Sequence, residues 1–395
     1  MTSSPRLALH YVLLFGVTGV SLPFAGLWLQ GLGLDGAEIG TLLAVPMLAR
    51  FVTGPLIAVW ADGFALRRTP IAILGGVAVL GYGAAALVEG YALWTLCWFV
   101  AATATSAIIP LIDVLGLRLA RREGFSFSVP RGCGSAAFVL ANLVMGALLL
   151  RLPVDAVIVW IMAGSALVAL YARFGLPAEA VSATGRASGR NRFLGLGRLL
   201  ADPVFMVAIL AIGAVQASHG FYYGFSAILW TGQGLSTSLV GALWAGSVII
   251  EIGFMWWLDP WRRRRGIGPG AMLAVGMVAG LVRWTALAFS PPLALLWPLQ
   301  ALHALTFAAT YLAGVEIVER LAPEDAQTAA QTLSSTLSAG VLIGIATVLS
   351  GPLYDAVGAG GYLAMSALVL LGAVAGLSLR RRLGPDSDRV RPGQG

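Results

Sequence analysis

Long apolar runs recur through the whole 395-residue chain, and they constrain its fold more than any other feature. A hydrocarbon core about 30 Å thick is crossed by roughly 20 consecutive apolar residues in an α-helix. Pro, Gly and charged residues divide the chain into twelve such runs, over residues 7–30, 37–60, 69–88, 91–117, 130–151, 154–173, 203–231, 237–257, 268–288, 292–316, 328–350 and 361–379. The sequence therefore predicts an all-α membrane protein with twelve transmembrane helices.

The composition agrees with this prediction and excludes other classes. Only 11% of the residues are charged, whereas an ordinary soluble domain has roughly a quarter. The runs are too long, and too rich in Leu, Ala and Gly, for the alternating strands of an outer-membrane barrel. The first run is too long for the core of a signal peptide, so we expect it to remain as the first helix.

The positive charge of the chain follows its expected topology. All 25 basic residues are arginines, and the formal net charge is +7. With the spans placed as above, 21 arginines fall on one side of the membrane, and only Arg151 falls in a loop on the other side. Because positive loops stay in the cytoplasm, both termini are expected there. The charge thus indicates topology rather than a nucleic-acid partner.

One long polar loop separates the sixth span from the seventh and divides the chain into two halves. The second span can be aligned with the eighth from Gly40 and Gly241, and the alignment places Arg50 and Glu251 at matching depths. Two six-helix bundles with a substrate site between them are typical of secondary transporters. The expected organisation is a first six-helix bundle over 1–174 and a second over 201–380. A cytoplasmic linker over 175–200 joins them, and a cytoplasmic tail follows over 381–395.

Polar residues inside the spans collect on single helix faces. At 100° per residue, five side chains of the seventh span fall within an arc of about 80°. They are Gln216, His219, Tyr223, Ser226 and Trp230. The tenth span has a similar face with Gln300, His303, Phe307, Thr310 and Tyr311. Such faces suit the lining of a wet cavity, although hydrogen bonds between neighbouring helices would produce the same pattern.

Five ionisable residues lie in the spans, where each costs at least about 2.5 kcal/mol unless it is paired or hydrated. They are Arg50, Asp113, Arg131, Glu251 and Arg283. A carboxyl group balanced between burial and a nearby arginine can exchange a proton near neutral pH. These residues therefore predict proton coupling, with permanent structural salt bridges as the alternative.

Acids followed by basic clusters stand at two span ends. Asp62 precedes Arg67 and Arg68, and Asp259 precedes four arginines. Such pairs can hold neighbouring helices in one conformation and are interpreted as gating residues, although positive loops alone also produce the pattern. Glu316 and Asp355, near helix ends, are interpreted as solvated caps. The two cysteines, Cys97 and Cys133, are interpreted as small core residues.

Several stretches together resemble the major facilitator superfamily. Within it, the chain is similar to the proton-symporter branch typified by phenylpropionate permeases, which is related more distantly to lactose permease and nucleoside symporters. The matching stretches are LPFAGLWLQGLGL, LARF, PLIDVL, RGCGSAAFV, YYGFSAILW, VRW and LQALHALTF, in spans one, two, four, five, seven, nine and ten.

The resemblance implies roles for matching residues. Asp113 and Arg131 match an acid and an arginine that hold substrate in lactose permease. Glu251, Arg283 and His303 match its proton-coupling acid, arginine and histidine. The chain departs from that pattern in three places. Thr306 replaces the helix-ten glutamate, Val129 replaces a basic residue before Arg131, and DGFALRR is an irregular form of the loop motif.

The expected function is proton-coupled import of a small organic solute by alternating access. An aromatic carboxylate is favoured, a sugar or nucleoside stays open, and the alternative is a proton-antiporting exporter of hydrophobic compounds. The expected substrate contacts are Trp28, Arg50, Asp113, Arg131, Gln216, His219, Tyr222, Tyr223, Trp230, Gln300 and His303. Proton coupling is expected at Glu251, Asp113, Arg283 and His303.

Enzymatic activity is not expected, because the chain has three histidines and neither an H-E-x-x-H nor a G-x-S-x-G motif. The expected partners are the substrate, protons and the lipid bilayer of the bacterial inner membrane. We expect no cofactor, metal or nucleic acid, and a monomer.

Overall fold

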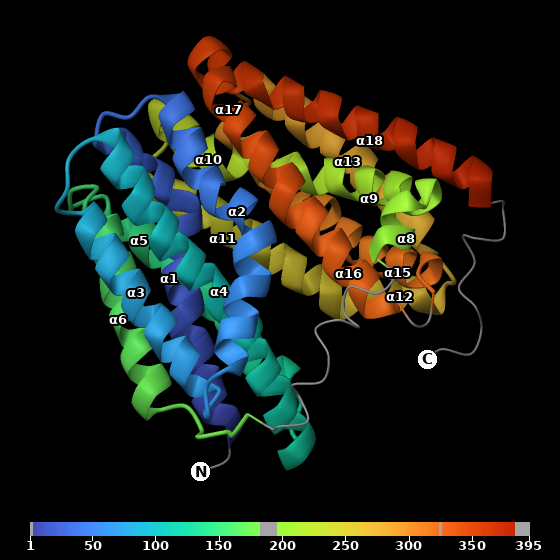
Figure 1. Ribbon diagram of the computed structural model, residues 1–395. Coiled ribbons are helices and arrows are strands. Elements are labelled where there is room, and N and C mark those ends of the chain that lie inside the picture. The colour runs from blue at the N-terminus through green and yellow to red at the C-terminus, as the bar shows by residue number, and fades with distance from the viewer. Residues whose placement is uncertain (1–2, 182–195, 324–325, 384–395) are drawn as a thin grey trace. The chain divides into compact units, whose positions relative to one another are not determined.

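A computed structural model describes residues 3–181, 196–323 and 326–383, and helices make up nearly all of these residues (Figure 1). The part of the chain that is described contains no strand beyond an isolated bridge between Leu66 and Ala180. The all-α prediction is confirmed.

The first half forms six uninterrupted helices, coloured blue to green in Figure 1. Asp35 caps the second with its side chain, and Glu38 completes a capping box. Gly124 ends the fourth in the left-handed conformation that glycine favours, at φ 73°. The helices are α1 (Ser3–Gly31), α2 (Gly36–Asp62), α3 (Arg68–Ala85), α4 (Tyr91–Glu123), α5 (Ser128–Leu148) and α6 (Ala156–Phe174).

The second half is divided into more helical elements, and most of them are shorter. Asp202 caps α9 with its side chain, directly before Pro203. The elements are α8 (Leu196–Ala201), α9 (Pro203–Ala217), α10 (His219–Gly232), α11 (Thr237–Gly253), η2 (Phe254–Leu258), α12 (Asp259–Arg264), α13 (Pro269–Ala288), α14 (Leu293–Ala301), η3 (Ala304–Ala309), α15 (Thr310–Leu321), α16 (Gln327–Thr336), η5 (Leu337–Leu342), α17 (Ile343–Val357), η6 (Gly358–Gly361) and α18 (Tyr362–Leu383).

Eleven helical stretches of the described residues are long and apolar enough to cross a membrane. The last of them, Ala329–Leu377, contains both α17 and α18, which are separated by a 3₁₀ turn at Gly358–Gly361. Counting it as two spans gives the twelve that the sequence predicts. The twelve-helix fold is therefore confirmed.

Four spans of the second half are not the single α-helices that the sequence predicts. The seventh is interrupted at Ser218, between α9 and α10. The eighth, tenth and eleventh each contain a π-helical turn, at η2, η3 and η5. A π turn holds an extra residue, so helical periodicity read across it is shifted. The polar face expected across 216–230 likewise does not lie on one continuous α-helix, because the interruption at Ser218 falls within it.

The chain divides into two compact units. Unit 1 comprises Met1–Ala187 and Gly224–Ala245, and unit 2 comprises Ser188–Tyr223 and Gly246–Gly395. This division assigns parts of α10 and α11 to unit 1, whereas the sequence places them in the second bundle. The predicted boundaries stay a prediction, and much of the predicted linker and tail lies outside the described residues.

Glycines bring helices of unit 1 into close contact. A Cβ atom on Gly26 in α1 would lie 2.4 Å from the carbonyl oxygen of Gly224 in α10. A Cβ atom on Gly241 in α11 would lie 2.3 Å from the carbonyl oxygen of Asn142 in α5. Both distances are too short for any side chain, so glycine is required at these crossings.

Candidate functional site

Arg283 in α13 is the centre of a buried polar cluster in unit 2. Its side chain is fully buried, and each of its terminal nitrogens donates hydrogen bonds to neutral groups. Nη1 donates to His303 Nδ1 at 3.1 Å and to Thr306 Oγ1 at 3.2 Å, and Nη2 donates to Gln300 Oε1 at 2.6 Å. The cluster therefore joins the ninth span to the tenth.

Aromatic rings cover the guanidinium of Arg283. Its carbon lies 4.7 Å from the ring centre of Tyr222 and 4.5 Å from that of Trp284, within the range of cation–π attraction. Its Nε has no hydrogen-bond partner. No carboxylate of the described residues forms an ion pair with it. Arg283 is thus a buried cation whose neighbours do not balance its charge.

The contacts of His303 assign its tautomer. A guanidinium only donates hydrogen bonds, so Nδ1 of His303 accepts from Arg283 and carries no proton. The proton of the neutral ring is therefore on Nε2, which lies 3.5 Å from Oε2 of Glu251. A second proton, on Nδ1, would oppose the guanidinium at close range. His303 thus links Arg283 to the carboxylate of Glu251 in its neutral form.

His219 in α10 contacts the same cluster through Thr306. Its Nδ1 lies 3.2 Å and 3.1 Å from the carbonyl oxygens of Val215 and Gln216, so Nδ1 carries the proton. Its Nε2 is then free to accept from the Thr306 hydroxyl at 3.1 Å. Thr306 thus connects His219 to Arg283. The structure therefore brings His219 against a neighbouring helix.

Other predicted residues of the seventh and tenth spans border this cluster. Gln300 donates through Nε2 to the hydroxyl of Tyr222 at 3.0 Å. Gln216 donates to the carbonyl of Phe307 at 3.2 Å. The ring of Tyr223 lies 5.6 Å from that of His219. Apart from Trp230 and Asp259, the predicted site residues of spans seven to ten therefore gather around Arg283 in unit 2.

A second, smaller charged site lies in unit 1. Arg131 Nε in α5 is 3.7 Å from Asp113 Oδ1 in α4, and the hydroxyl of Tyr11 donates to the same oxygen at 2.5 Å. The guanidinium also lies over the ring of Phe15, at 4.3 Å. The side chains of Arg131 and Asp113 are 34% and 32% exposed. The two residues that the resemblance paired are indeed neighbours.

The remaining predicted substrate contacts of unit 1 are Trp28, Trp230 and Arg50. Trp28 is buried, and its ring stacks on Trp98 at 6.1 Å. Trp230, assigned to unit 1, is buried as well. Arg50 is exposed on α2, without a hydrogen bond or ion pair to any described residue.

The predicted gating residues behave differently at the two span ends. Arg67 and Arg68 bind the segment after α6: the backbone N–H of Arg67 donates to Glu179, and Nη1 of Arg68 donates to Leu176. Burial and the nearby Arg118 lower the pKa of Arg67, while Asp62 and Glu179 oppose that shift. Asp62 forms no ion pair with the described basic residues.

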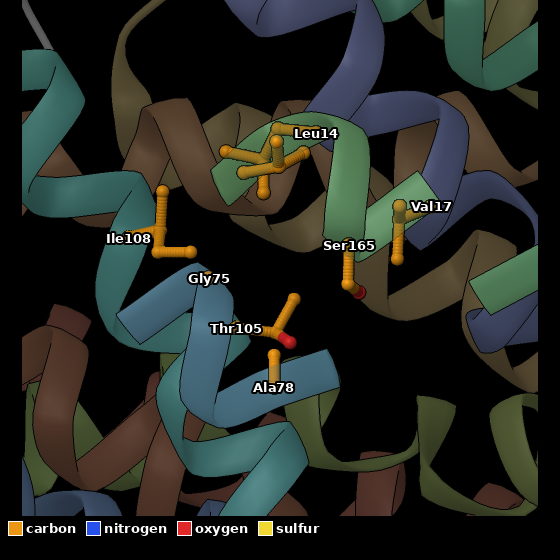
Figure 2. Close-up of a pocket in the computed structure, with 8 residues that line it drawn as sticks. Leu14, Val17, Gly75, Ala78, Thr105, Ile108 and Ser165 are labelled. Carbon is orange, nitrogen blue, oxygen red and sulfur yellow. The ribbon is translucent and has the colours of Figure 1, made fainter. Parts of the chain in front are cut away.

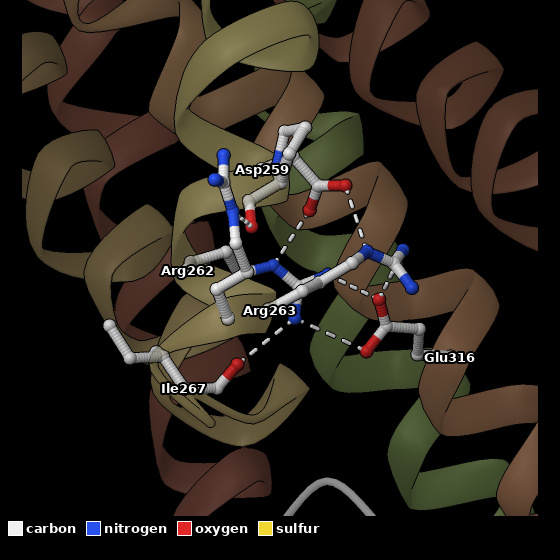
Figure 3. A network of polar contacts seen from close by, with 7 residues as sticks. Asp259, Arg262, Arg263, Ile267 and Glu316 are labelled. Atoms are coloured by element: carbon white, nitrogen blue, oxygen red, sulfur yellow. Dashed lines mark hydrogen bonds and ion pairs between the residues drawn. The ribbon is translucent and has the colours of Figure 1, made fainter. Parts of the chain in front are cut away.

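Asp259, in contrast, belongs to a network of ion pairs (Figure 3). Arg262 is buried and donates to Asp259 at 2.7 Å, to the carbonyl of Ile267 at 3.0 Å and to Glu316. Arg263 pairs with Asp259 at 3.0 Å and with Glu316 at 2.7 Å. The interpretation of Glu316 as a solvated cap is wrong, because Glu316 lies on α15 and forms ion pairs with two arginines of α12.

A pocket in unit 1 lies among α1, α3, α4 and α6 (Figure 2). It is lined by Leu14, Val17, Gly75, Ala78, Thr105, Ile108, Ser165 and Val168, none of which is charged. It therefore does not suit a charged solute. Across the described residues, no three His, Cys, Asp or Glu side chains form a group that could hold a metal ion.

Three contacts of the two charged sites were missed by the sequence reasoning. Tyr11 binds Asp113, Trp284 covers Arg283, and Thr306 joins His219 to Arg283. Thr306 was noted only as a departure from a family pattern. A signal existed for Trp284, which follows Arg283 directly, but no periodicity marked Tyr11.

Comparison with known proteins gives consistent results over nearly the whole chain. Residues 5–363 match the MFS_1 like family. A probable 3-phenylpropionic acid transporter of Escherichia coli (strain K12) is 29% identical over 378 residues, which cover 95% of this chain and 97% of that protein. A maltose permease of Geobacillus stearothermophilus is 28% identical, with 95% and 94% covered. The crystal structure of the nucleoside transporter NupG superposes with a TM-score of 0.81 at 18% identity, covering 96% of this chain and 98% of that one.

Proposed function

Because the chain belongs to the MFS_1 like family of the major facilitator superfamily and is therefore a transporter, we propose that it imports a small organic acid together with protons. The solute is an aromatic carboxylate. Transport proceeds by alternating access, in a monomer of the bacterial inner membrane with both termini in the cytoplasm. The E. coli relative is described as a transporter of 3-phenylpropionic acid, which is such a carboxylate.

The observation that carries the proposal is that Arg283 is buried with no carboxylate in direct contact. A buried ion that lacks a partner costs several kcal/mol, so a buried arginine among neutral groups is poised to accept an anion. Its Nε is free of hydrogen bonds. A carboxylate solute supplies the counter-charge, and the rings of Tyr222 and Tyr223 beside the cluster stack on its aromatic part.

Proton entry prepares the cluster for that anion. With Glu251 ionised, the charges of Glu251 and Arg283 sum to zero. When Glu251 takes a proton, the cluster becomes net positive and attracts a carboxylate. His303 does not take this proton, because its Nδ1 faces the Arg283 guanidinium. Glu251 is therefore the proposed proton carrier, and His303 transmits its state to Arg283.

The other predicted residues have supporting roles in this proposal. Asp113 and Arg131 contribute to solute and proton binding in unit 1. Asp62, Arg67, Arg68 and Asp259 stabilise one conformation at the helix ends. The remaining substrate contacts are Trp28, Arg50, Gln216, His219, Trp230, Gln300 and His303.

Replacement of the proposed proton carrier tests this function. Glu251→Gln should abolish uptake of phenylpropionate driven by a pH gradient in vesicles, while exchange of labelled for unlabelled solute continues. The control Glu319→Gln changes an exposed carboxylate on α15, outside the cluster. Unchanged active uptake in Glu251→Gln would contradict the assignment, and gradient-driven efflux by the wild-type protein would favour an exporter.

A further inference from the structure

A crevice of about 120 Å³ opens on the surface of unit 2 beside the network of Figure 3. Its walls come from η2, α12, α13 and η3, and nearly all of its lining is apolar. Leu258, Trp261 and Val275 at this crevice are 46%, 46% and 50% exposed. The lining residues are Phe254, Leu258, Trp261, Arg262, Ile267, Ala271, Met272, Val275, Leu305 and Ala309.

Two arginines without an ion pair follow Trp261 of this crevice, and the Nε of one of them, Arg264, donates to the carbonyl of Pro260 at 3.3 Å. Arg264 and Arg265 follow Trp261 by three and four residues, so all three side chains lie on one side of the helix end. The guanidinium of Arg265 lies 5.6 Å from the ring centre of Trp261, which ties it to the crevice wall. Both arginines are exposed, and neither forms an ion pair with a residue that the structure describes.

The neighbouring charges do not cancel these two. Arg262 and Arg263 are already paired with Asp259 and Glu316. The local sum of four arginines and two carboxylates is therefore +2. A surface with apolar walls, an exposed Trp and net positive charge at one end matches the chemistry of a lipid that has an acyl chain and an anionic headgroup.

We propose that this crevice binds an anionic phospholipid. One acyl chain lies along the apolar wall formed by Leu258, Met272 and Val275. The phosphate contacts Arg264 and Arg265, with the Trp261 indole at the level of the headgroup. A free phosphate ion would use the two arginines but would gain nothing from the crevice, so a lipid is the occupant that uses both parts.

Lipid retention by the purified full-length protein tests the proposal. Phosphatidylglycerol and phosphatidylcholine are added to delipidated protein in detergent, and bound lipid is quantified by native mass spectrometry. We expect retention of phosphatidylglycerol over phosphatidylcholine. The double variant Arg264→Gln/Arg265→Gln should lower this preference about 30-fold, because each arginine near an anionic headgroup contributes about 1 kcal/mol.

Two further variants separate the crevice from general charge. Ala271→Phe fills the crevice without removing a charge and should reduce retention of both lipids. Arg118→Gln/Arg121→Gln removes two exposed arginines from α4 and should leave the preference unchanged. Equal retention of both lipids by the wild-type protein would overturn the proposal. So would a preference that Arg264→Gln/Arg265→Gln leaves intact, or one that inorganic phosphate abolishes.

Discussion

Both units place an arginine among aromatic rings within the spans, and the two arginines differ in what balances their charge. Arg131 has Asp113 at 3.7 Å, and a third of its side chain is exposed. Arg283 is fully buried and has only neutral hydrogen-bond partners. The carboxylate of Glu251 does not touch it, because His303 lies between the two side chains. The first site is balanced by a carboxylate in direct contact, whereas the second is balanced by the more distant carboxylate of Glu251 only while Glu251 is ionised.

This difference suggests a division of labour between the two sites. Arg131 and Asp113 are in direct contact and partly exposed. Their charges therefore cost little free energy, because each offsets the other and water screens both. Full burial makes every change of charge near Arg283 costly, so its partners respond strongly to protonation. We therefore expect substitutions at Arg283 to act more strongly on transport than substitutions at Arg131.

The largest effect is expected from Arg283→Gln. Loss of a desolvated charge that faces a carboxylate costs 2–5 kcal/mol, so affinity for phenylpropionate should fall by at least about 30-fold. Stability should not fall, because the variant removes an unbalanced buried charge and keeps hydrogen-bond donors. Binding is measured by calorimetry and stability as Tm. Wild-type affinity in this variant would show that Arg283 does not bind the solute. It would also contradict the expectation that Arg283 acts more strongly on transport than Arg131.

A smaller effect is expected from Arg131→Ala. Its loss removes one charge-assisted contact in a partly hydrated site, worth about 1.5–3 kcal/mol, so affinity should fall roughly 10-fold or more. Arg151→Ala, in a loop by the predicted topology, serves as the matched control. Undiminished affinity in the purified Arg131→Ala protein would indicate a structural role for the Asp113–Arg131 pair.

The smallest effect is expected from Thr306→Val, which keeps the shape of the side chain and removes the hydroxyl shared by His219 and Arg283. Arg283 keeps its bonds to His303 and Gln300 in this variant, so the main loss is the neutral bond to His219. Such a bond contributes about 0.5–1.5 kcal/mol, so proton-driven uptake should fall about 2- to 10-fold. Thr310→Val, on the same span, removes a hydroxyl that bonds only to its own helix. Equal losses in both variants would show that Thr306 has no special role.

Much of the fold could be predicted from the sequence, because span number depends on the length and hydropathy of each segment. The twelve spans, the neighbouring positions of Asp113 and Arg131, and the grouping of Arg283 with His303 all agree with the expectations. Spacing alone could not predict Tyr11 beside Asp113, because that contact depends on how α1 packs on α4. Nor could it predict the ion pairs of Glu316, which depend on Arg263 and on Arg262, 54 residues away.

The polar faces were predicted less well than the spans. The expected face of the tenth span extends from Gln300 to Tyr311, and the π turn of η3 lies within it. Thr310 and Tyr311 follow that turn, and their side chains differ in burial: Thr310 is buried and Tyr311 is 53% exposed. A wheel at 100° per residue assumes uninterrupted α-helix, and the sequence carries no signal for the extra residue of a π turn.

The three π turns also bear on how a membrane helix can turn some of its side chains toward different neighbours. In hydrocarbon a helix cannot unwind for this purpose, because each freed N–H or C=O group costs several kcal/mol. A π turn that moves along the helix by one residue exchanges one set of intrahelical bonds for another. The residue it passes turns by about 100° around the axis, while the helix on either side remains intact. His303 directly precedes η3 and Thr306 lies within it, so a step that passes one of these residues would turn its side chain away from Arg283 without breaking the tenth span.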